Sequence, residues 1–225
     1  MTNKNIFVAC DASSQKEVLD LLELIHEDIS GIKIGLQYIT QRSPEEIREL
    51  SKFKKPIFYD GKFFDIKNTL IESIKSLKSL KVDYATVHLL NGLDALRVAN
   101  EAAQEINLKL LGVSVLTSFN DEDLKNLGFS NKVDNQVKKL IEIAIKANLY
   151  GVICSPLEIK MIKEIAPDLK CFTPGIRMGK AKDDQKRTMS ANEAIKEGSD
   201  CLIIGRPITK GDPKKNIKHI LSSIE

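Results

Sequence analysis

The sequence lacks several features that mark specialised classes of protein. It contains no tryptophan and only 5% aromatic residues, so it offers few of the stacking surfaces on which single-stranded nucleic acids bind. Its net charge of +3 is small and its basic residues form no long run, which argues against nucleic acid as a partner. No stretch approaches the roughly 18 consecutive apolar residues of a membrane span. We therefore expect a soluble globular protein that binds neither nucleic acid nor membrane.

Cysteine is also scarce, and its spacing does not indicate a metal site. Each of the four cysteines lies in or beside an apolar run, with no Cys-x-x-Cys or histidine-containing ligand spacing. Buried, reduced thiols in a cytosolic protein are the expected explanation. The first apolar run is too short for a secretory signal, so we expect a cytoplasmic protein. The cysteines are Cys10, Cys154, Cys171 and Cys201.

What the sequence does contain is a regular succession of short apolar runs rich in β-branched residues. Most of them show no polar alternation, which is typical of parallel strands buried on both faces. Eight such runs are present, over residues 6–10, 32–35, 57–59, 84–87, 108–115, 151–154, 170–172 and 201–204.

Amphipathic helical patterns separate these runs. Residues 14–25, 69–80 and 134–147 each place apolar side chains three or four positions apart, which predicts helices with one buried face. Ser13 or Ser14 is the candidate N-cap of the first helix. Strand and helix alternate along the chain, and no linker rich in proline, glycine or serine divides it.

This alternation predicts an α/β fold. Eight βα units in a chain of 225 residues suit a (β/α)8 TIM barrel, with residues 1–225 forming a single domain. The competing architecture is an open sheet with helices on both faces. Such a sheet usually carries a glycine-rich phosphate fingerprint after its first strand, where this sequence reads CDASSQ. The barrel is therefore favoured.

Polar residues follow the predicted strands at the end where TIM barrels carry their chemistry. A random polar surface would not keep register with eight separate apolar runs, so we interpret these residues as an active site. They are Asp11, Lys33, Asp60, Lys62, Asp65, His88, Thr117, Ser118, Ser155, Gly175, Arg177, Gly205 and Arg206.

The last two strands predict a phosphate site. TPGIR (173–177) and IIGRPI (203–208) each bring a glycine and an arginine to the loops that bind phosphate in many barrels. Arginine presents a planar fork of donors that matches phosphate oxygens. The alternative is that the glycines only form tight turns and the arginines pair with helix carboxylates.

The polar segment 178–188 follows the first of these arginines. It contains the pair Asp184–Gln185, and it would close over a bound anion with Gln185 donating to a phosphate oxygen. A solvated surface loop explains its composition equally well.

Charges of alternating sign follow two neighbouring strands, in Lys33, Asp60, Lys62 and Asp65. Such charges within about 4 Å hold one another ionised and fix one another's geometry. A lysine held in this way is a poor general base but a well-aimed proton donor, and an aspartate beside it would repel an anionic substrate group. The combination fits decarboxylation followed by protonation of a carbanion. It also fits enolate formation, so the charges alone leave the reaction open.

These residues carry a resemblance to a known family. The signature D-x-K-x-x-D-I is present as DGKFFDI (60–66), and the blocks VSVLTS (113–118), TPGIR and IGRPIT (204–209) follow it in order. The whole sequence resembles the orotidine 5'-monophosphate decarboxylase family, bacterial type. The resemblance implies a (β/α)8 barrel that converts orotidine 5'-monophosphate to UMP and CO2 in pyrimidine biosynthesis, with no metal or organic cofactor.

The resemblance also implies a role for each matching residue. Lys62 would protonate C6 as CO2 leaves, Asp60 would lie against the substrate carboxylate, and Lys33 and Asp65 would complete the charged array. A homodimer is implied, in which Asp65, Ile66 and Thr69 reach the partner's site. The remaining substrate contacts implied are Asp11 and Lys33 for the ribose hydroxyls, Thr117 for the base, Pro174, and Arg177, Gln185, Gly205 and Arg206 for the phosphate.

One stretch departs from the family pattern. VHLLNG (87–92) stands where the family more often has histidine, two small residues and two glycines. The bulkier Leu89, Leu90 and Asn91 are expected to affect local packing or the dimer contact rather than the chemistry. His88 is interpreted as a residue that hydrogen-bonds between barrel strands.

Two alternatives remain. A magnesium-dependent phosphosugar decarboxylase or hexulose-phosphate synthase of the same suprafamily shares the Asp-x-Lys-x-x-Asp core. Those enzymes usually lack the isoleucine after the second aspartate, present here as Ile66, and the LTS and GIR blocks. The other alternative is a non-catalytic nucleotide-binding barrel, which would not need all four alternating charges.

Overall fold

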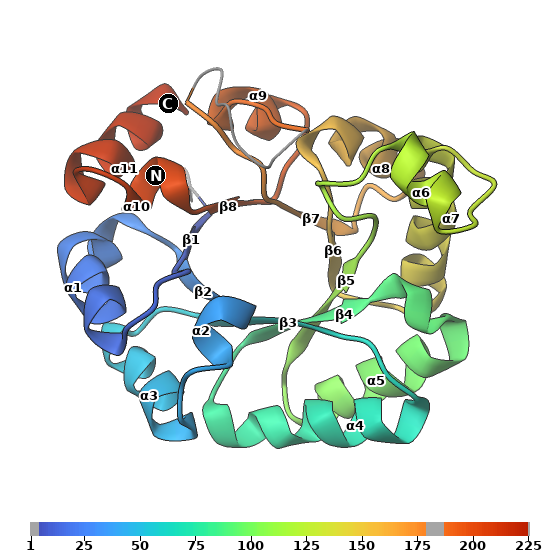
Figure 1. Ribbon diagram of the computed structural model, residues 1–225, viewed down its shortest axis with the longest axis horizontal. Helices are drawn as coiled ribbons and strands as arrows, with labels where there is room; N and C mark the ends of the chain where they lie inside the picture. Colours follow the sequence, from blue (N-terminus) through green and yellow to red (C-terminus); the bar gives the residue numbers. More distant parts are fainter. Residues whose placement is uncertain (1–4, 179–186, 225) are drawn as a thin grey trace.

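The computed structural model describes residues 5–178 and 187–224. Within them, parallel strands β1 to β8 close into a barrel in chain order, and helices surround the strands (Figure 1). This confirms the predicted (β/α)8 barrel. The strands are β1 (Ile6–Ala9), β2 (Gly31–Gly35), β3 (Ile57–Phe63), β4 (Tyr84–His88), β5 (Lys109–Val113), β6 (Gly151–Ile153), β7 (Lys170–Thr173) and β8 (Cys201–Ile204).

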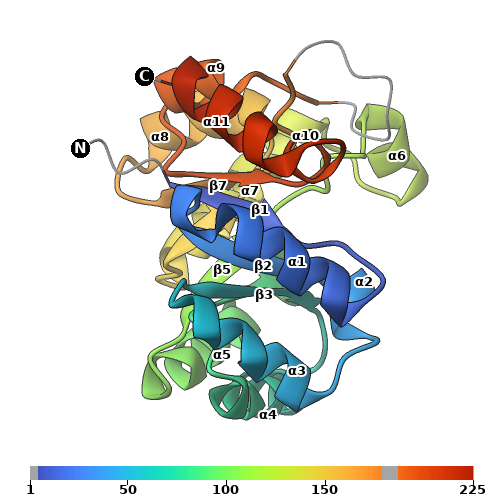
Figure 2. The same cartoon turned by 90° about the vertical axis from the view of Figure 1, so that its left-hand side faces the viewer.

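The helices connect successive strands and cover the outside of the barrel. The short helices α2, α6 and α10 lie toward one end of it (Figure 2). The α-helices are α1 (Gln15–Ile25), α2 (Leu36–Ile39), α3 (Pro44–Glu49), α4 (Lys67–Ser76), α5 (Leu93–Glu105), α6 (Asp121–Asn126), α7 (Val133–Lys146), α8 (Ile159–Ile165), α9 (Ala191–Lys196), α10 (Arg206–Thr209) and α11 (Pro213–Ser223). The 3₁₀ helices are η1 (His26–Asp28), η2 (Leu50–Phe53), η3 (Leu77–Leu80), η4 (Leu89–Asn91) and η5 (Pro156–Glu158).

The three helices expected from periodicity are present, with small shifts at their ends. Ser14 is the N-cap of α1, and its side chain accepts a hydrogen bond from the Glu17 amide. The segment predicted over residues 69–80 begins earlier, at Lys67, and its last turn is the 3₁₀ helix η3. Among the described residues, no helix is long and apolar enough to cross a membrane.

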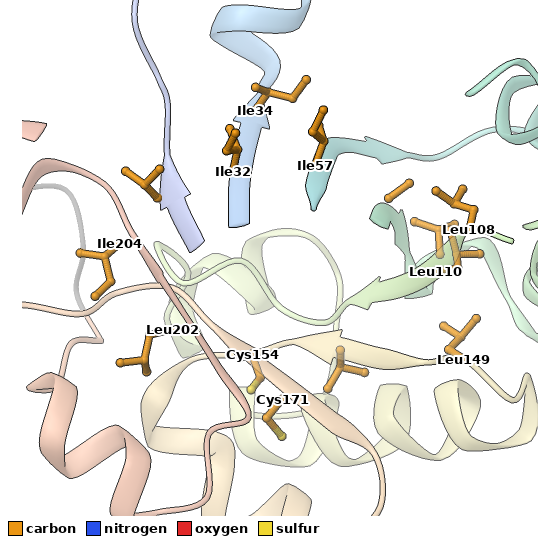
Figure 3. Close-up of a cluster of buried hydrophobic side chains, with 14 of the residues drawn as sticks. Ile32, Ile34, Ile57, Leu108, Leu110, Leu149, Cys154, Cys171, Leu202 and Ile204 are labelled. Atoms are coloured by element: carbon orange, nitrogen blue, oxygen red, sulfur yellow. The ribbon is translucent and has the colours of Figure 1, made fainter. Parts of the chain in front are cut away.

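The strands sort their side chains between two apolar layers. Ile32 and Ile34 of β2 point outward into the large core between barrel and helices (Figure 3). Lys33 lies between them in sequence and therefore points into the barrel, because side chains alternate along a strand. The buried cysteines Cys154 and Cys171 belong to the same outer core.

The interior of the barrel is filled at the N-terminal half of its strands. Phe7, Phe58 and Phe172 pack edge to face there, with ring centroids 6.0–6.4 Å apart. Two positions further along β1 and β3, the small Ala9 and the polar Asp60 line an open cavity instead. The aromatic layer therefore confines the cavity to the C-terminal ends of the strands, where a barrel binds its ligands.

Strand β3 carries an irregularity at the D-x-K signature. Tyr59 pairs with Ala85 and Phe63 pairs with Val87, so the three residues 60–62 of β3 face the single residue Thr86 of β4. This bulge extends β3 beyond the predicted end at Tyr59. Bulges of this kind re-aim side chains at the rims of barrels and next to active sites.

Candidate active site

The cavity at the C-terminal ends of the strands has a volume of about 690 Å³. It gathers predicted residues from strands that are far apart in sequence. The predicted site residues that line it are Asp11, Lys33, Asp60, Lys62, Thr117, Ser118, Pro174, Gly175, Arg177, Gly205 and Arg206. Gln185 lies outside the described residues.

Three further polar residues line the cavity without having been singled out in the sequence. Gln37 follows β2 on helix α2, Thr209 ends helix α10, and Lys210 follows it. Their position in the segments that follow β2 and β8 was the available signal, but α2 and α10 are too short to be recognised from periodicity.

The first charged pair of the site joins β2 to β1. The ammonium of Lys33 donates to both carboxylate oxygens of Asp11, at 2.8 and 3.1 Å. The Lys33 side chain is only 8% exposed, so this pair is shielded from solvent on the lysine side. Gly35 makes room for it, because a Cβ there would lie 2.8 Å from an Asp11 oxygen and 3.0 Å from the lysine nitrogen.

The second charged pair lies on the β3 bulge. Lys62 Nζ donates to Asp60 Oδ2 at 2.8 Å, and both side chains line the cavity. The other oxygen, Asp60 Oδ1, accepts from the Thr86 hydroxyl at 2.9 Å. Among the described residues, no ion pair links this pair to Lys33 or to Asp65, so the four-charge array stays a prediction.

Thr86 is a residue that the sequence interpretation missed. It is fully buried on β4, and besides donating to Asp60 it accepts a 2.8 Å hydrogen bond from the Lys62 amide. The available signal was a hydroxyl in an otherwise apolar strand, but threonine is a common β-former and drew no attention there.

The second half of the signature lies outside the lining of the described cavity. Asp65, Ile66 and Thr69 are exposed, and none of them lines the described cavity. Ile66 is 73% exposed and Phe64 is 63% exposed, which is unusual for large apolar side chains beside a site. Exposed apolar side chains that gather in one place are typical of a surface that binds another protein.

Asn91 holds the backbone of this exposed segment. Its side-chain amide donates to the carbonyls of Phe63 and His88, at 3.0 and 2.8 Å. Its side-chain oxygen accepts from the Asp65 amide at 3.1 Å. The departure at VHLLNG (87–92) therefore has two effects. The Asn91 side chain forms a hydrogen-bonded clamp between the end of β3 and the end of β4. Leu89 is fully buried in the core.

His88 makes a local contact rather than the expected bond between barrel strands. Its Nδ1 accepts from the Leu90 amide at 3.3 Å, and its ring lies 5.8 Å from that of Phe64. Burial, reinforced by the positive charge of Lys62, lowers the pKa of the His88 imidazole. A neutral imidazole at the start of η4 follows from this arrangement.

The opposite wall of the cavity comes from the loops after β7 and β8. Gly175 adopts φ +81°, a conformation that favours glycine. Two residues further on, the Arg177 amide donates to the Met189 carbonyl at 2.9 Å. Gly205 and Arg206 line the same wall at the start of α10.

A buried ion pair braces this wall against β5 and β6. Arg187 pairs with Glu158 and donates to the Leu116 carbonyl at 3.0 Å, next to Thr117 of the cavity. The Ser155 amide donates to the same carboxylate at 2.9 Å. Burial raises the pKa of Glu158, although Arg187 opposes that shift.

No described group of three or more histidine, cysteine or acidic side chains is arranged to hold a metal ion. The four cysteines are buried and unpaired, as expected. Burial raises the pKa of Cys10 to about 12, so that thiol stays protonated.

A barrel with lysine–aspartate pairs facing an arginine-bearing wall defines a class of TIM-barrel enzymes that act on anionic substrates. The chain belongs to the orotidine 5'-phosphate decarboxylase / HUMPS family, whose model matches residues 4–220.

Relatives of similar length carry the first of these two names. An orotidine 5'-phosphate decarboxylase of Wolbachia pipientis subsp. Culex pipiens is 38% identical over 221 residues, covering 97% of this chain and 98% of that protein. One from Lawsonia intracellularis is 37% identical over 227 residues, covering 97% of this chain and 98% of that protein.

Solved structures agree with the fold. The crystal structure of orotidine 5'-phosphate decarboxylase from Lactobacillus acidophilus superimposes with a TM-score of 0.86 at 29% identity, covering 99% of this chain and all of that one. An uncharacterised conserved protein from Geobacillus kaustophilus, at 24% identity and a TM-score of 0.85, covers 98% of this chain and all of its own and shows the fold alone.

Proposed function

We propose that this chain, as one decarboxylase domain over residues 1–225, converts orotidine 5'-monophosphate to UMP and CO2. The observation that carries the proposal is the single cavity that joins the Lys62–Asp60 pair to the wall bearing Arg177 and Arg206. Relatives covering nearly the whole chain are orotidine 5'-phosphate decarboxylases, which supports the same reaction.

In the proposed reaction, Asp60 lies against the C6 carboxylate of the substrate. Two adjacent negative charges repel each other, and the departure of CO2 removes that repulsion. The bond from C6 to the carboxyl carbon breaks, its electron pair stays on C6, and the Lys62 ammonium delivers a proton there. Because Lys62 Nζ lies 2.8 Å from Asp60 Oδ2, the proton donor already lies where the carboxylate leaves.

Fixed charges lower the free energy of the C6 carbanion. The charged groups are oriented before the substrate binds, so they need no reorganisation as negative charge develops at C6. Binding of the remote phosphate supplies energy that holds the base against these groups. The mechanism uses no cofactor.

The remaining contacts are assigned from the family resemblance, and all of these residues except Gln185 line the described cavity. We assign Asp11 and Lys33 to the ribose hydroxyls and Thr117 to the base. The phosphate contacts assigned are Arg177, Gln185, Gly205 and Arg206, together with Pro174.

We also propose that the active form is a homodimer. Asp65, Ile66 and Thr69 are exposed and do not line their own described cavity, which leaves them accessible to complete the site of a second copy. The exposed Phe64 and Ile66 supply apolar surface for that contact.

The test is to follow the loss of ultraviolet absorbance of orotidine 5'-monophosphate with purified protein, in the presence of EDTA. Turnover is expected without any added cofactor. A folded dimer that leaves the substrate intact refutes the proposed function. Activity on phosphosugar substrates that requires magnesium would instead support the suprafamily alternative.

A further inference from the structure

Thr86 of β4 lies where the regular backbone hydrogen bonding between β3 and β4 is interrupted. The bulge sets Asp60, Gly61 and Lys62 against this one residue, so the ladder of backbone hydrogen bonds is interrupted. Lys62 adopts φ +48°, in the left-handed region that side-chain-bearing residues rarely visit. Such a conformation persists only where surrounding contacts determine it.

The Thr86 hydroxyl supplies those contacts. Its oxygen accepts from the Lys62 amide at 2.8 Å, and its hydrogen goes to Asp60 Oδ1 at 2.9 Å. The Lys62 ammonium takes the second carboxylate oxygen at 2.8 Å. A closed ring of three hydrogen bonds thus joins the backbone of Lys62, the hydroxyl, the carboxylate and the lysine head group.

We propose that Thr86 is a positioning residue for the reaction, which fixes the orientation of the Asp60 carboxylate and the backbone that aims Lys62. This inference rests on the proposed decarboxylase function. The hydroxyl contacts no substrate position, because Thr86 is fully buried and does not line the described cavity.

Loss of the hydroxyl would affect turnover more than binding. Without it, one oxygen of Asp60 has no partner from β4, and the amide of Lys62 is left without an acceptor. The carboxylate and ammonium can then rotate together away from the substrate. The ribose and phosphate contacts come from β1, β2, β7 and β8, so nucleotide binding does not depend on the bulge.

The test compares Thr86→Val with Thr86→Ser. Valine keeps the shape but removes the hydroxyl, whereas serine keeps the hydroxyl. Because misplacement of reacting groups by about 1 Å costs on the order of 100-fold in rate, we expect Thr86→Val to lower kcat roughly 10- to 100-fold. KM should change by less than about threefold, and Thr86→Ser should keep most of kcat.

A control variant separates positioning from general stability. Asn100 is a buried polar residue of α5 whose side chain donates to the Ala147 and Asn148 carbonyls, on the outer side of the barrel. Asn100→Ala should lower the melting temperature and leave kcat unchanged. An equal loss of kcat in both variants would mean that Thr86 acts only through stability, and the proposal would be overturned.

Amide hydrogen exchange provides a readout that needs no turnover. The Lys62 amide should exchange slowly in the wild type and in Thr86→Ser, and much faster in Thr86→Val. Unchanged exchange at Lys62, or wild-type kcat in Thr86→Val, overturns the proposal. If the wild type itself fails to decarboxylate, the proposed function is wrong, and the exchange comparison alone decides whether Thr86 holds the bulge.

Discussion

Replacement of Arg187 by alanine should destabilise the fold strongly. The variant leaves the Glu158 carboxylate, which is 2% exposed, without its cationic partner and with the Ser155 amide as its remaining described donor. Breaking a buried ion pair from one side costs about 3–5 kcal/mol. For a chain of this size each kcal/mol lowers the melting temperature by about 2–4 °C, so a fall of about 6–20 °C is expected.

The same variant should show a defined dependence on pH. Burial raises the folded-state pKa of Glu158 above its ordinary value, so the folded protein binds this proton more tightly than the unfolded chain. Stability from this group is therefore present at low pH and declines as pH rises through the raised pKa. Without Arg187 the pKa rises further, so Arg187→Ala should lose less stability at pH 5 than at pH 8.

Denaturant unfolding at both pH values measures this effect. Arg48→Ala is the matched control, because Arg48 pairs with Glu45 at the surface, with side chains 33% and 72% exposed. Such exposed pairs contribute roughly 0.2–1 kcal/mol. If Arg187→Ala costs no more than Arg48→Ala at pH 8, the argument from burial is wrong.

Three further substitutions test the site itself. Lys62→Ala should bind UMP normally but abolish turnover, measured by calorimetry and the absorbance assay, and an active variant would rule out Lys62 as the acid. Gly35→Ala should raise KM several-fold with less effect on kcat, because the added methyl group lies 3.0 Å from Lys33 Nζ and disturbs its ion pair; unchanged steady-state kinetics would contradict this. Asn91→Ala should weaken the proposed dimer and lower activity at low protein concentration, since the Asp65 amide loses its acceptor; sedimentation measures the dimer, and activity independent of concentration would count against the clamp.

The ends of the apolar runs made much of this site predictable, because TIM barrels bind their ligands at the C-terminal ends of their strands. This reasoning singled out Asp11, Lys33 and Thr117, and the structure brings all three into the cavity. The isoleucines on either side of Lys33 face the outer core, so the lysine side chain points into the barrel.

What the sequence left hidden depends on how neighbouring strands are aligned. The β3 bulge exists only relative to β4, so neither the φ of Lys62 nor the role of Thr86 follows from either strand alone. The Arg187–Glu158 pair joins the segments that follow the neighbouring strands β6 and β7, and nothing in the sequence spacing of these residues indicates it. Predicting the end of a strand from its apolar run likewise misses a bulge, because the strand continues there with polar residues.

The aromatic layer inside the barrel determines where small molecules can enter and leave it. Phe7, Phe58 and Phe172 are at most 5% exposed and close the barrel on the side of the strand N-termini. A molecule that enters the cavity at the C-terminal ends of the strands must therefore leave at that same end. If CO2 forms beside Asp60, it therefore has to leave through the same opening as the nucleotide product.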